Sequence, residues 1–243
     1  MQKKVLEVCL SPAMYSKHAD SEIVVVVIDI LRATSAICTA LANGASEIIP
    51  VDTVEEARKR KMEGSLVAAE RDGFVLDFAD FGNSPFNFTP ERVKNKSIVY
   101  STTNGTGIIN MSSECNKVLI GSYLNFSALA SWLINQERDV LIFCAGWKER
   151  ISLEDTICAG AFATKLINSG EFTTICDSAI ASMDLWDMAK DDLNGYIEKA
   201  AQRSRLRDKG LDDCIEFCHT FDFTDVIPVL KDGKLIPLSE LRY

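Results

Sequence analysis

The chain has 243 residues, of which 47% are hydrophobic, 8% aromatic and 25% charged, a composition typical of a soluble globular protein with one large or two small domains. An excess of acidic residues gives a net charge of −9, so the chain lacks the basic field that nonspecific binding to nucleic acid or to an anionic membrane requires. No apolar run approaches the ~20 residues of a membrane span and no secretory signal follows Met1, so we expect a cytoplasmic protein.

Strand and helix patterns alternate along most of the chain, which predicts an α/β fold. The run Ile23–Ile30 is almost entirely β-branched, as is typical of a strand buried on both faces of a sheet. Thr53 and Glu56 form a capping box that begins a helix. In chain order, the other predicted elements are strand Lys4–Leu10, helix Ser35–Asn43, strand Glu47–Val51, strand Leu66–Ala69, strand Ser97–Tyr100, helix Thr106–Met111, strand Lys117–Ile120, helix Asn125–Gln136, strand Val140–Ala145, helix Leu153–Ser169, charged helices within Asp187–Arg207 and Leu211–Cys218, and a hairpin over Val226–Pro237 that turns at Asp232-Gly233.

Two segments of the chain resemble each other in outline. Residues 23–44 and 140–170 each contain an apolar strand, a polar loop and a helix of small residues that ends near Asn and Gly. One interpretation is coincidence, because any two strand–loop–helix units share this outline. The alternative is an ancient duplication. We predict two α/β subdomains, residues 1–125 and 126–243, that share one active site.

The loop after the buried strand carries Asp29 and Arg32. An ionised carboxylate at the end of a β-branched run is costly to desolvate unless a metal, an arginine or a phosphate group compensates its charge. Arg32 and Thr34 lie just before a helix, where backbone N–H groups and the helix dipole favour an anion. The simpler interpretation is a helix cap with a surface arginine. We favour the interpretation that this loop belongs to a functional site.

The loop Ser101–Gly107 consists of small and hydroxyl residues with two glycines. Such a loop can curl so that successive N–H groups converge on a phosphate or sulfonate, with threonine hydroxyls as further donors. It lacks the lysine of a nucleotide-binding P-loop, and a polar turn with a helix cap is the alternative. If the loop holds a ligand, Gly105 should have a positive φ or should face the ligand too closely for a Cβ.

A third loop places Glu70 beside Arg71, shortly before the turn Gly82-Asn83-Ser84-Pro85. Glu70 offers a hard oxygen ligand and Arg71 a bidentate fork for an oxyanion. The turn alone is a weak signal, because turns use these residue types routinely.

A fourth loop ends in Glu154 and Asp155 at the start of a helix. The two carboxylates can serve the helix dipole alone, or they can join Asp29 and Glu70 in a carboxylate site that would favour Mg²⁺ over zinc. The chain has only two histidines, so it offers few candidates for acid–base catalysis by histidine. Carboxylates, arginines and an anion-binding loop suit phosphoryl transfer, where catalysis depends on positioning and charge neutralisation.

Five motifs together resemble the 2-phosphosulfolactate phosphatase (ComB) family, in the family's order and over about residues 1–240. They are Asp29-Ile30-Leu31-Arg32-Ala33-Thr34, Glu70-Arg71, Gly82-Asn83-Ser84-Pro85, Thr102-Thr103-Asn104-Gly105-Thr106 and Ala145-Gly146-Trp147 with Glu154-Asp155. The resemblance implies a three-layer α/β/α fold with two related subdomains. It also implies a Mg²⁺-dependent phosphatase that removes phosphate from 2-phospho-3-sulfolactate, a step toward coenzyme M. The chain departs from the family at residues 202–206, where a Ser-x-His-Gly-like segment is expected and no histidine occurs. If this segment shapes the substrate end of the pocket, the acid accepted here would differ.

We therefore predict a Mg²⁺-dependent phosphomonoesterase for a small anionic hydroxy-acid phosphate, and the alternative is a noncatalytic binding protein for a small organic anion. Either Asp29 or a water activated by the metal attacks phosphorus. The predicted catalytic residues are Asp29, Arg32, Glu154 and Asp155, and the predicted metal ligands are Asp29, Glu70, Glu154 and Asp155. The predicted phosphate- and substrate-binding residues are Arg71, Asn83, Ser84, Thr102, Thr103, Asn104, Gly105, Thr106 and Lys148, with Arg150 as a further candidate for the carboxylate or sulfonate. Apart from the substrate, the one partner we consider is a second copy of the chain, in a homodimer.

Overall fold

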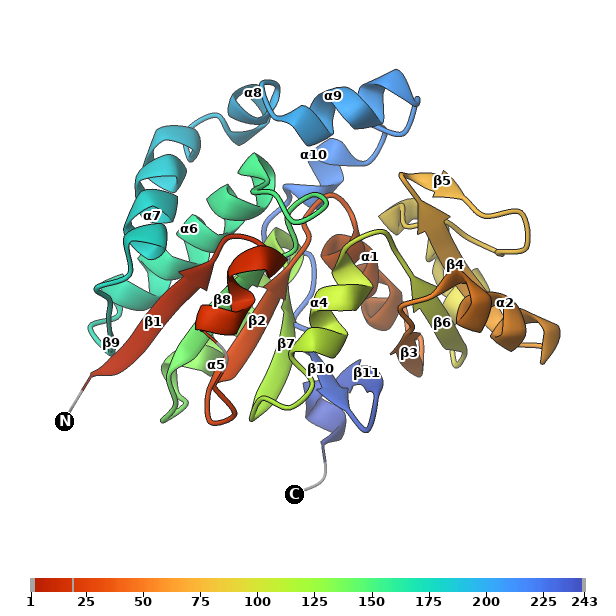
Figure 1. Ribbon diagram of the computed structural model, residues 1–243, viewed down its shortest axis with the longest axis horizontal. Coiled ribbons are helices and arrows are strands. Elements are labelled where there is room, and N and C mark those ends of the chain that lie inside the picture. Colours follow the sequence, from red (N-terminus) through yellow and green to blue (C-terminus); the bar gives the residue numbers. More distant parts are fainter. Residues whose placement is uncertain (1–2, 19, 242–243) are drawn as a thin grey trace.

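The computed structural model describes residues 3–18 and 20–241, which form an α/β fold around one eleven-stranded mixed sheet (Figure 1). The predicted fold class is therefore confirmed. The strands are β1 (Lys4–Cys9), β2 (Val24–Ile28), β3 (Glu47–Pro50), β4 (Leu66–Arg71), β5 (Phe74–Val75), β6 (Ser97–Ser101), β7 (Lys117–Gly121), β8 (Val140–Cys144), β9 (Phe172–Thr173), β10 (Pro228–Lys231) and β11 (Lys234–Pro237).

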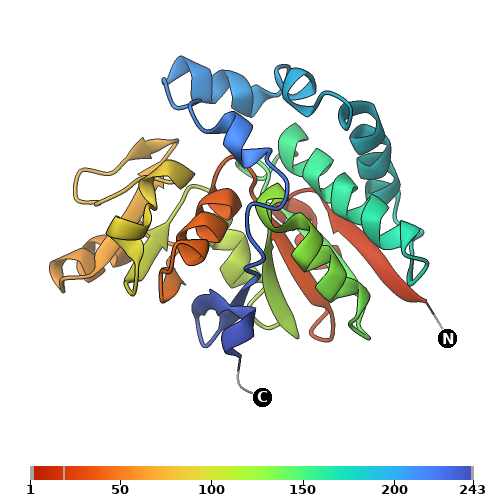
Figure 2. The same cartoon turned by 180° about the vertical axis from the view of Figure 1, so that it is seen from behind.

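Helices lie over both faces of this sheet (Figures 1 and 2). They are α1 (Ala33–Ala42), α2 (Val54–Met62), α3 (Pro90–Val93), α4 (Gly105–Met111), α5 (Phe126–Ile134), α6 (Leu153–Asn168), α7 (Asp177–Ala189), α8 (Leu193–Ile197), α9 (Ala201–Asp208) and α10 (Ile215–Cys218), with short 3-10 helices at Pro12–Lys17, Pro85–Asn87, Tyr123–Asn125 and Leu238–Glu240. Successive residues of β2 enter two different cores, because side chains alternate across a strand. Val24 and Val26 pack with residues of α5 and α6, whereas Val25 and Val27 pack with residues of α1 and α4.

The sheet consists of two parallel blocks that a hairpin joins. The strand order is β5-β4-β6-β3-β11-β10-β7-β2-β8-β1-β9. Strands β4, β6 and β3 pair in parallel, as do β7, β2, β8, β1 and β9, whereas β10 and β11 pair antiparallel with each other and with β7 and β3. The predicted hairpin is confirmed, and its turn residues Asp232 and Gly233 have φ of 49° and 76°. Its position in the middle of the sheet has no signal in the local sequence.

The predicted subdomains both contribute strands to this one sheet. Strand β1, from the first predicted subdomain, pairs with β8 and β9 from the second. The division at residues 125 and 126 stays a prediction, but a single sheet explains how loops from both parts reach one site. Among residues 3–18 and 20–241, no helix has both the length and the apolar character that crossing a membrane requires.

Most predicted elements agree with the structure to within two residues, and α7 is the main exception. The prediction placed charged helices from Asp187 onward, but α7 begins at Asp177. This helix packs closely against α6, and a Cβ at Gly160 would lie 1.9 Å from the carbonyl oxygen of Ser182. Small buried residues make this contact, so α7 lacks the strong stripe of large apolar residues by which a helix is found in a sequence.

Candidate active site

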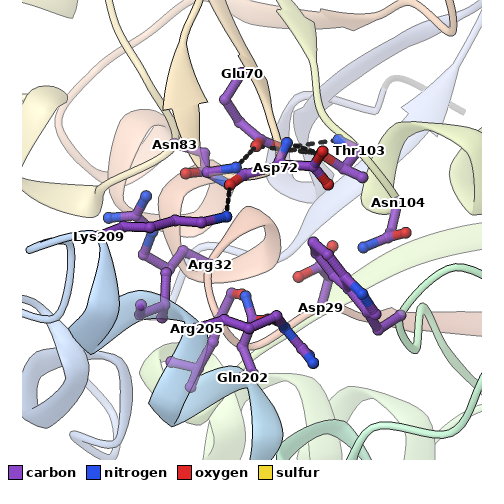
Figure 3. A pocket seen from close by; sticks show the side chains of 14 residues that line it. Asp29, Arg32, Glu70, Asp72, Asn83, Thr103, Asn104, Gln202, Arg205 and Lys209 are labelled. Atoms are coloured by element: carbon purple, nitrogen blue, oxygen red, sulfur yellow. Dashed lines mark hydrogen bonds between the residues drawn. The ribbon is translucent and has the colours of Figure 1, made fainter.

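The loops that follow β2, β4, β6 and β8 meet helix α9 at a cleft of about 390 Å³, which includes the solvent at its mouth (Figure 3). The loops of the two parallel blocks thus face each other across one space, with α9 over it. The cleft is lined by Asp29, Leu31, Arg32, Glu70, Asp72, Gly73, Asn83, Thr103, Asn104, Trp147, Gln202, Arg205, Leu206 and Lys209.

Asp29 lies deep in this cleft, at the end of the buried strand β2. Its carbonyl oxygen accepts a hydrogen bond from the N–H of Thr34 at 2.9 Å, and its own N–H donates to Thr34 Oγ1 at 3.3 Å, so the turn into α1 holds it in place. Burial, together with the charges of Asp155, Glu70 and Glu154, raises the pKa of Asp29 well above its usual range. In the described part of the chain, no cationic side chain is hydrogen-bonded to the Asp29 carboxyl. Asp29 is therefore a carboxyl group whose ionisation this site makes costly unless a cation or a proton accompanies it.

Glu70 holds two loops together at one side of the cleft. Its Oε1 accepts hydrogen bonds from the N–H of Thr103 at 2.7 Å and from Thr103 Oγ1 at 3.1 Å, and its Oε2 accepts from the N–H of Gly73 at 2.5 Å. Glu70 is only 3% exposed, so these bonds compensate the burial of its carboxylate. These bonds occupy lone pairs of the Glu70 oxygens, so Glu70 positions the loop after β6 more directly than it binds a ligand.

Asp155 joins the loops that follow β2 and β8. It accepts hydrogen bonds from the N–H of Ile30 at 2.9 Å, the N–H of Gly146 at 3.1 Å and Ser152 Oγ at 2.6 Å. Burial raises the pKa of Asp155 to about 6 in spite of these donors, and burial with the neighbouring Asp155 charge raises the pKa of Glu154 to about 8. Asp155 thus positions the backbone directly after Asp29 and the start of the loop after β8.

The four predicted metal ligands surround one region but do not meet at one point. Within residues 3–18 and 20–241, no group of three or more His, Cys, Asp or Glu side chains has a geometry that could hold a metal ion. Glu70 and Asp155 are occupied by backbone and hydroxyl donors, whereas the Asp29 carboxyl receives, from the described residues, only a 3.5 Å contact from the N–H of Ala33. Because Mg²⁺ commonly binds one or two carboxylates and completes its shell with water and substrate phosphate, Asp29 fits such an ion without the full predicted set.

Three of the five N–H groups in the loop Thr102–Thr106 are bonded within the protein, so the predicted cradle of N–H groups for a ligand stays a prediction for Asn104 and Gly105 alone. The N–H of Thr102 donates to Thr106 Oγ1 at 3.3 Å, and the N–H of Thr106 donates to Thr102 Oγ1 at 3.2 Å. The N–H of Thr103 is bonded to Glu70. Short hydroxyl side chains here close the loop and the first turn of α4, as they commonly do at helix starts. Thr103 and Asn104 are the members of the loop that line the cleft.

Gly105 touches Asp29 and not the ligand space, and its φ is outside the left-handed region. Of the two alternatives predicted for Gly105, the positive φ is therefore not observed. A Cβ at Gly105 would lie 2.8 Å from Asp29 Oδ2 and 2.8 Å from the Ala33 Cβ. Glycine is needed here because α4 begins directly against the Asp29 carboxyl.

Thr106→Val should destabilise the protein without removing a ligand contact. Thr106 is 1% exposed, and valine would leave the N–H of Thr102 buried without a partner, which costs ~1–3 kcal/mol. Thr106→Ser keeps the hydroxyl and serves as the control. Urea unfolding of the two variants measures the difference, and an equal stability of Thr106→Val and wild type would show that the hydroxyl does not close the loop.

Arg32 is the basic residue nearest in the chain to Asp29, and it is 3% exposed while lining the cleft. Its Nη1 donates to the carbonyl oxygen of Leu211 at 3.2 Å and to Cys214 Sγ at 3.9 Å, and its Nε is buried without a partner in the described residues. A hydrogen bond from Cys218 and the nearby Arg32 charge lower the pKa of the Cys214 thiol to about 7. The Arg32 guanidinium is thus anchored through Nη1, whereas its Nε has no partner among the described residues.

Several predicted binding residues lie elsewhere. Arg71 donates to the carbonyl oxygen of Glu70 at 2.6 Å and to Ser101 Oγ at 2.9 Å, and it does not line the cleft. Lys148 forms an ion pair with Asp72 at 2.9 Å, and it too is absent from the lining. Arg71 is turned away because two backbone carbonyls and a hydroxyl already satisfy its guanidinium.

The turn at residues 82–85 contributes one residue to the cleft. Asn83 lines it and is 8% exposed, and its Oδ1 has no hydrogen-bond partner in the described part of the protein. The Ser84 hydroxyl is buried beside Cys214, away from the cleft lining. Of the two predicted residues, Asn83 therefore lines the cleft and Ser84 does not.

The largest group that sequence reasoning missed comes from α9 and the residues after it. Gln202, Arg205, Leu206 and Lys209 line the cleft. Gln202 and Arg205 lie opposite Glu70 and Thr103, whereas Lys209 reaches Asp72 in the loop after β4 (Figure 3). The one available signal was the departure from the family pattern at residues 202–206, which the structure places at the cleft. Asp72, Gly73 and Trp147 also line it without having been predicted.

Comparisons with known proteins agree with this picture. The model of the family described as 2-phosphosulpholactate phosphatase matches residues 9–233. Relatives named "Probable 2-phosphosulfolactate phosphatase" include one from Thermotoga petrophila, 39% identical over 87% of this chain and 90% of the relative, and one from Caldanaerobacter subterraneus subsp. tengcongensis, 38% identical over 86% and 88%. A third, from Clostridium perfringens, is 33% identical over 95% of both chains. The chain therefore belongs to the 2-phosphosulfolactate phosphatases, a family of phosphoric monoester hydrolases.

Proposed function

We propose that this protein hydrolyses the phosphate ester of 2-phosphosulfolactate, or of a similar small anionic 2-hydroxy acid, to the hydroxy acid and phosphate. The observation that carries the proposal is Asp29, a partly buried carboxyl with raised pKa at the bottom of a cleft that Arg32, Arg205 and Lys209 also line. The names of the relatives support the substrate. A substrate with several negative charges fits a cleft that combines cationic groups with an acid poised for chemistry.

The cleft residues have separate roles in this reaction. Asp29 supplies the attacking oxygen, which would form an aspartyl phosphate that water then hydrolyses, or it orients the attacking water. Arg32 stands on the same turn and holds the phosphoryl oxygens as their charge changes during transfer. Glu70 and Asp155 keep the loops around Asp29 in position through their backbone hydrogen bonds.

Mg²⁺ is part of this proposal. The uncompensated Asp29 carboxyl fits one protein ligand of such an ion, with Glu154 as the second candidate because it is close enough for its charge to act on Asp29. When bound, the ion would neutralise charge on the phosphate and polarise the P–O bond. A role in coenzyme M synthesis, a cytoplasmic location and a homodimer also stay predictions.

Phosphate release from 2-phosphosulfolactate should depend on Mg²⁺. We expect EDTA to abolish turnover, Mg²⁺ to restore it and Zn²⁺ to be a poor substitute, because the cleft offers hard oxygen ligands. A phosphate-release assay on 2-phosphosulfolactate and a panel of other small phosphate esters measures this. Full activity of a metal-stripped sample would refute the metal, whereas no turnover with any ester together with ligand-induced thermal stabilisation would indicate a binding protein.

A further inference from the structure

Arg205 is held rigidly at the side of the cleft that α9 forms. Gln202 Nε2 donates to the carbonyl oxygen of Leu31 at 3.0 Å, and Gln202 Oε1 accepts a hydrogen bond from Arg205 Nε at 2.8 Å. The guanidinium carbon of Arg205 lies 4.3 Å from the centre of the Trp147 ring. A hydrogen bond in the guanidinium plane and an aromatic surface below it together fix the orientation of the group.

The two terminal nitrogens of Arg205 are free for a ligand. Among residues 3–18 and 20–241, neither of them donates a hydrogen bond to the protein, since the guanidinium bonds through its Nε to Gln202. Partial burial lowers the pKa of the Arg205 guanidinium, and the attraction of the Glu154 carboxylate opposes this shift. The protein thus orients the Arg205 guanidinium and leaves its terminal nitrogens to bind two oxygens of an oxyanion.

The other basic residues near the cleft are already engaged. Lys209 donates to the carbonyl oxygen of Asp72, and Lys148 pairs with the Asp72 carboxylate. Arg32 is on the turn that carries Asp29, so it belongs with the reacting phosphate. Arg205 comes from a different element and faces the cleft from the side opposite Glu70 and Thr103 (Figure 3).

We propose that Arg205 is the specificity-determining residue that binds the sulfonate of the substrate. The inference rests on the proposed function with 2-phosphosulfolactate as the substrate, and it replaces the expectation that the altered segment 202–206 selects a different acid. In 2-phosphosulfolactate the carboxylate is on the same carbon as the phosphate ester, whereas the sulfonate is one carbon further away. The carboxylate must therefore lie beside the phosphate, near Arg32, and an anion receptor on a separate helix reaches the more distant group. A sulfonate spreads its charge over three oxygens, which match the diffuse, weakly hydrated charge of a guanidinium.

The test crosses two variants with two substrates. The substrates are 2-phosphosulfolactate and 2-phospholactate, which lacks only the sulfonate. Arg205→Gln should lower kcat/KM for the sulfonated ester about 100-fold, the loss of a charged hydrogen-bonded contact of ~1.5–3 kcal/mol. The same variant should change kcat/KM for 2-phospholactate less than about threefold. Arg205→Lys should keep only part of the activity on the sulfonated ester, because it retains the charge without the fork.

Arg207→Gln is the matched control on the same helix. Arg207 is exposed, pairs with Glu198 and does not line the cleft, so its loss should leave both substrates unaffected. Equal losses on the two substrates in Arg205→Gln would overturn the assignment.

Binding of the product sulfolactate, measured by calorimetry, keeps this inference distinct from the proposed function. A wild-type protein that fails to release phosphate overturns the proposed function alone. Arg205 is then still tested, because Arg205→Gln should raise the Kd for sulfolactate at least about tenfold and leave the Kd for lactate unchanged. An unchanged Kd for sulfolactate in the folded variant would reject the sulfonate contact.

Discussion

Asp29→Asn should lower kcat for phosphate release at least ~10³-fold and should make the metal-free protein more stable. The amide neither attacks phosphorus nor holds a cation, and loss of a residue at the reacting centre commonly costs this much or more. The stability gain follows from the raised pKa. The folded protein holds the Asp29 proton more tightly than the unfolded chain does, so stability is lost as pH rises from about 4 through the folded pKa. Asparagine does not ionise and avoids this loss.

Steady-state kinetics with Mg²⁺ measures the change in kcat. Thermal melts in EDTA over pH 4 to 8 measure the change in stability. The control is Asp77→Asn, whose carboxylate is exposed, pairs with Arg58 and does not line the cleft. It should change neither kcat nor the pH dependence of the melting temperature. A folded Asp29→Asn protein with nearly wild-type turnover would reduce Asp29 to a structural residue of the turn.

Gly105→Ala should lower kcat about 100-fold while the protein stays folded. The new Cβ would lie 2.8 Å from both Asp29 Oδ2 and the Ala33 Cβ, closer than atoms of these kinds pack. Ala33 begins α1 and has no flexible side chain, so the Asp29 carboxyl must move. A displacement of ~1 Å at a reacting group can cost ~10²-fold in rate.

Gly107→Ala is a control two residues along the same helix. No atom of the described residues lies within 4 Å of a Cβ at Gly107, so kcat should be unchanged and the free energy of unfolding should rise by up to ~1 kcal/mol through helix propensity. Kinetics at saturating substrate with circular dichroism compares the pair. If Gly105→Ala and Gly107→Ala turn over equally fast, the position of Asp29 does not depend on the start of α4.

The sequence predicts the elements of this fold better than it predicts which side chains enter the cleft. Strands such as β2 are found because their buried, β-branched residues leave a local signal. The carboxyls of Asp29 and Glu70 were predicted for a similar reason, since a charge beside an apolar run is unusual, and Asp155 was predicted as one of two adjacent carboxylates at a helix start. Arg71 was misplaced because residue type does not tell whether a guanidinium faces a ligand or the neighbouring backbone.

The same limit explains the Thr102–Thr106 loop and the contribution of α9. Donors in a loop look alike in sequence whether they bind a ligand or one another, and the structure shows Thr102 and Thr106 bonded mutually. Gln202 and Arg205 lie on a polar helix more than 170 residues from Leu31, which Gln202 contacts. Only the tertiary arrangement brings that helix over the loops.

The place of the β10–β11 hairpin has a consequence for how the chain is made. These strands pair with β7 and β3, yet they are synthesised after every other strand of the sheet. Until residues 228–237 emerge, β3 and β7 are each left with an open edge, the kind of surface through which incomplete chains aggregate. A nascent chain would therefore carry two open strand edges within its sheet until its last hairpin fills the gap between them.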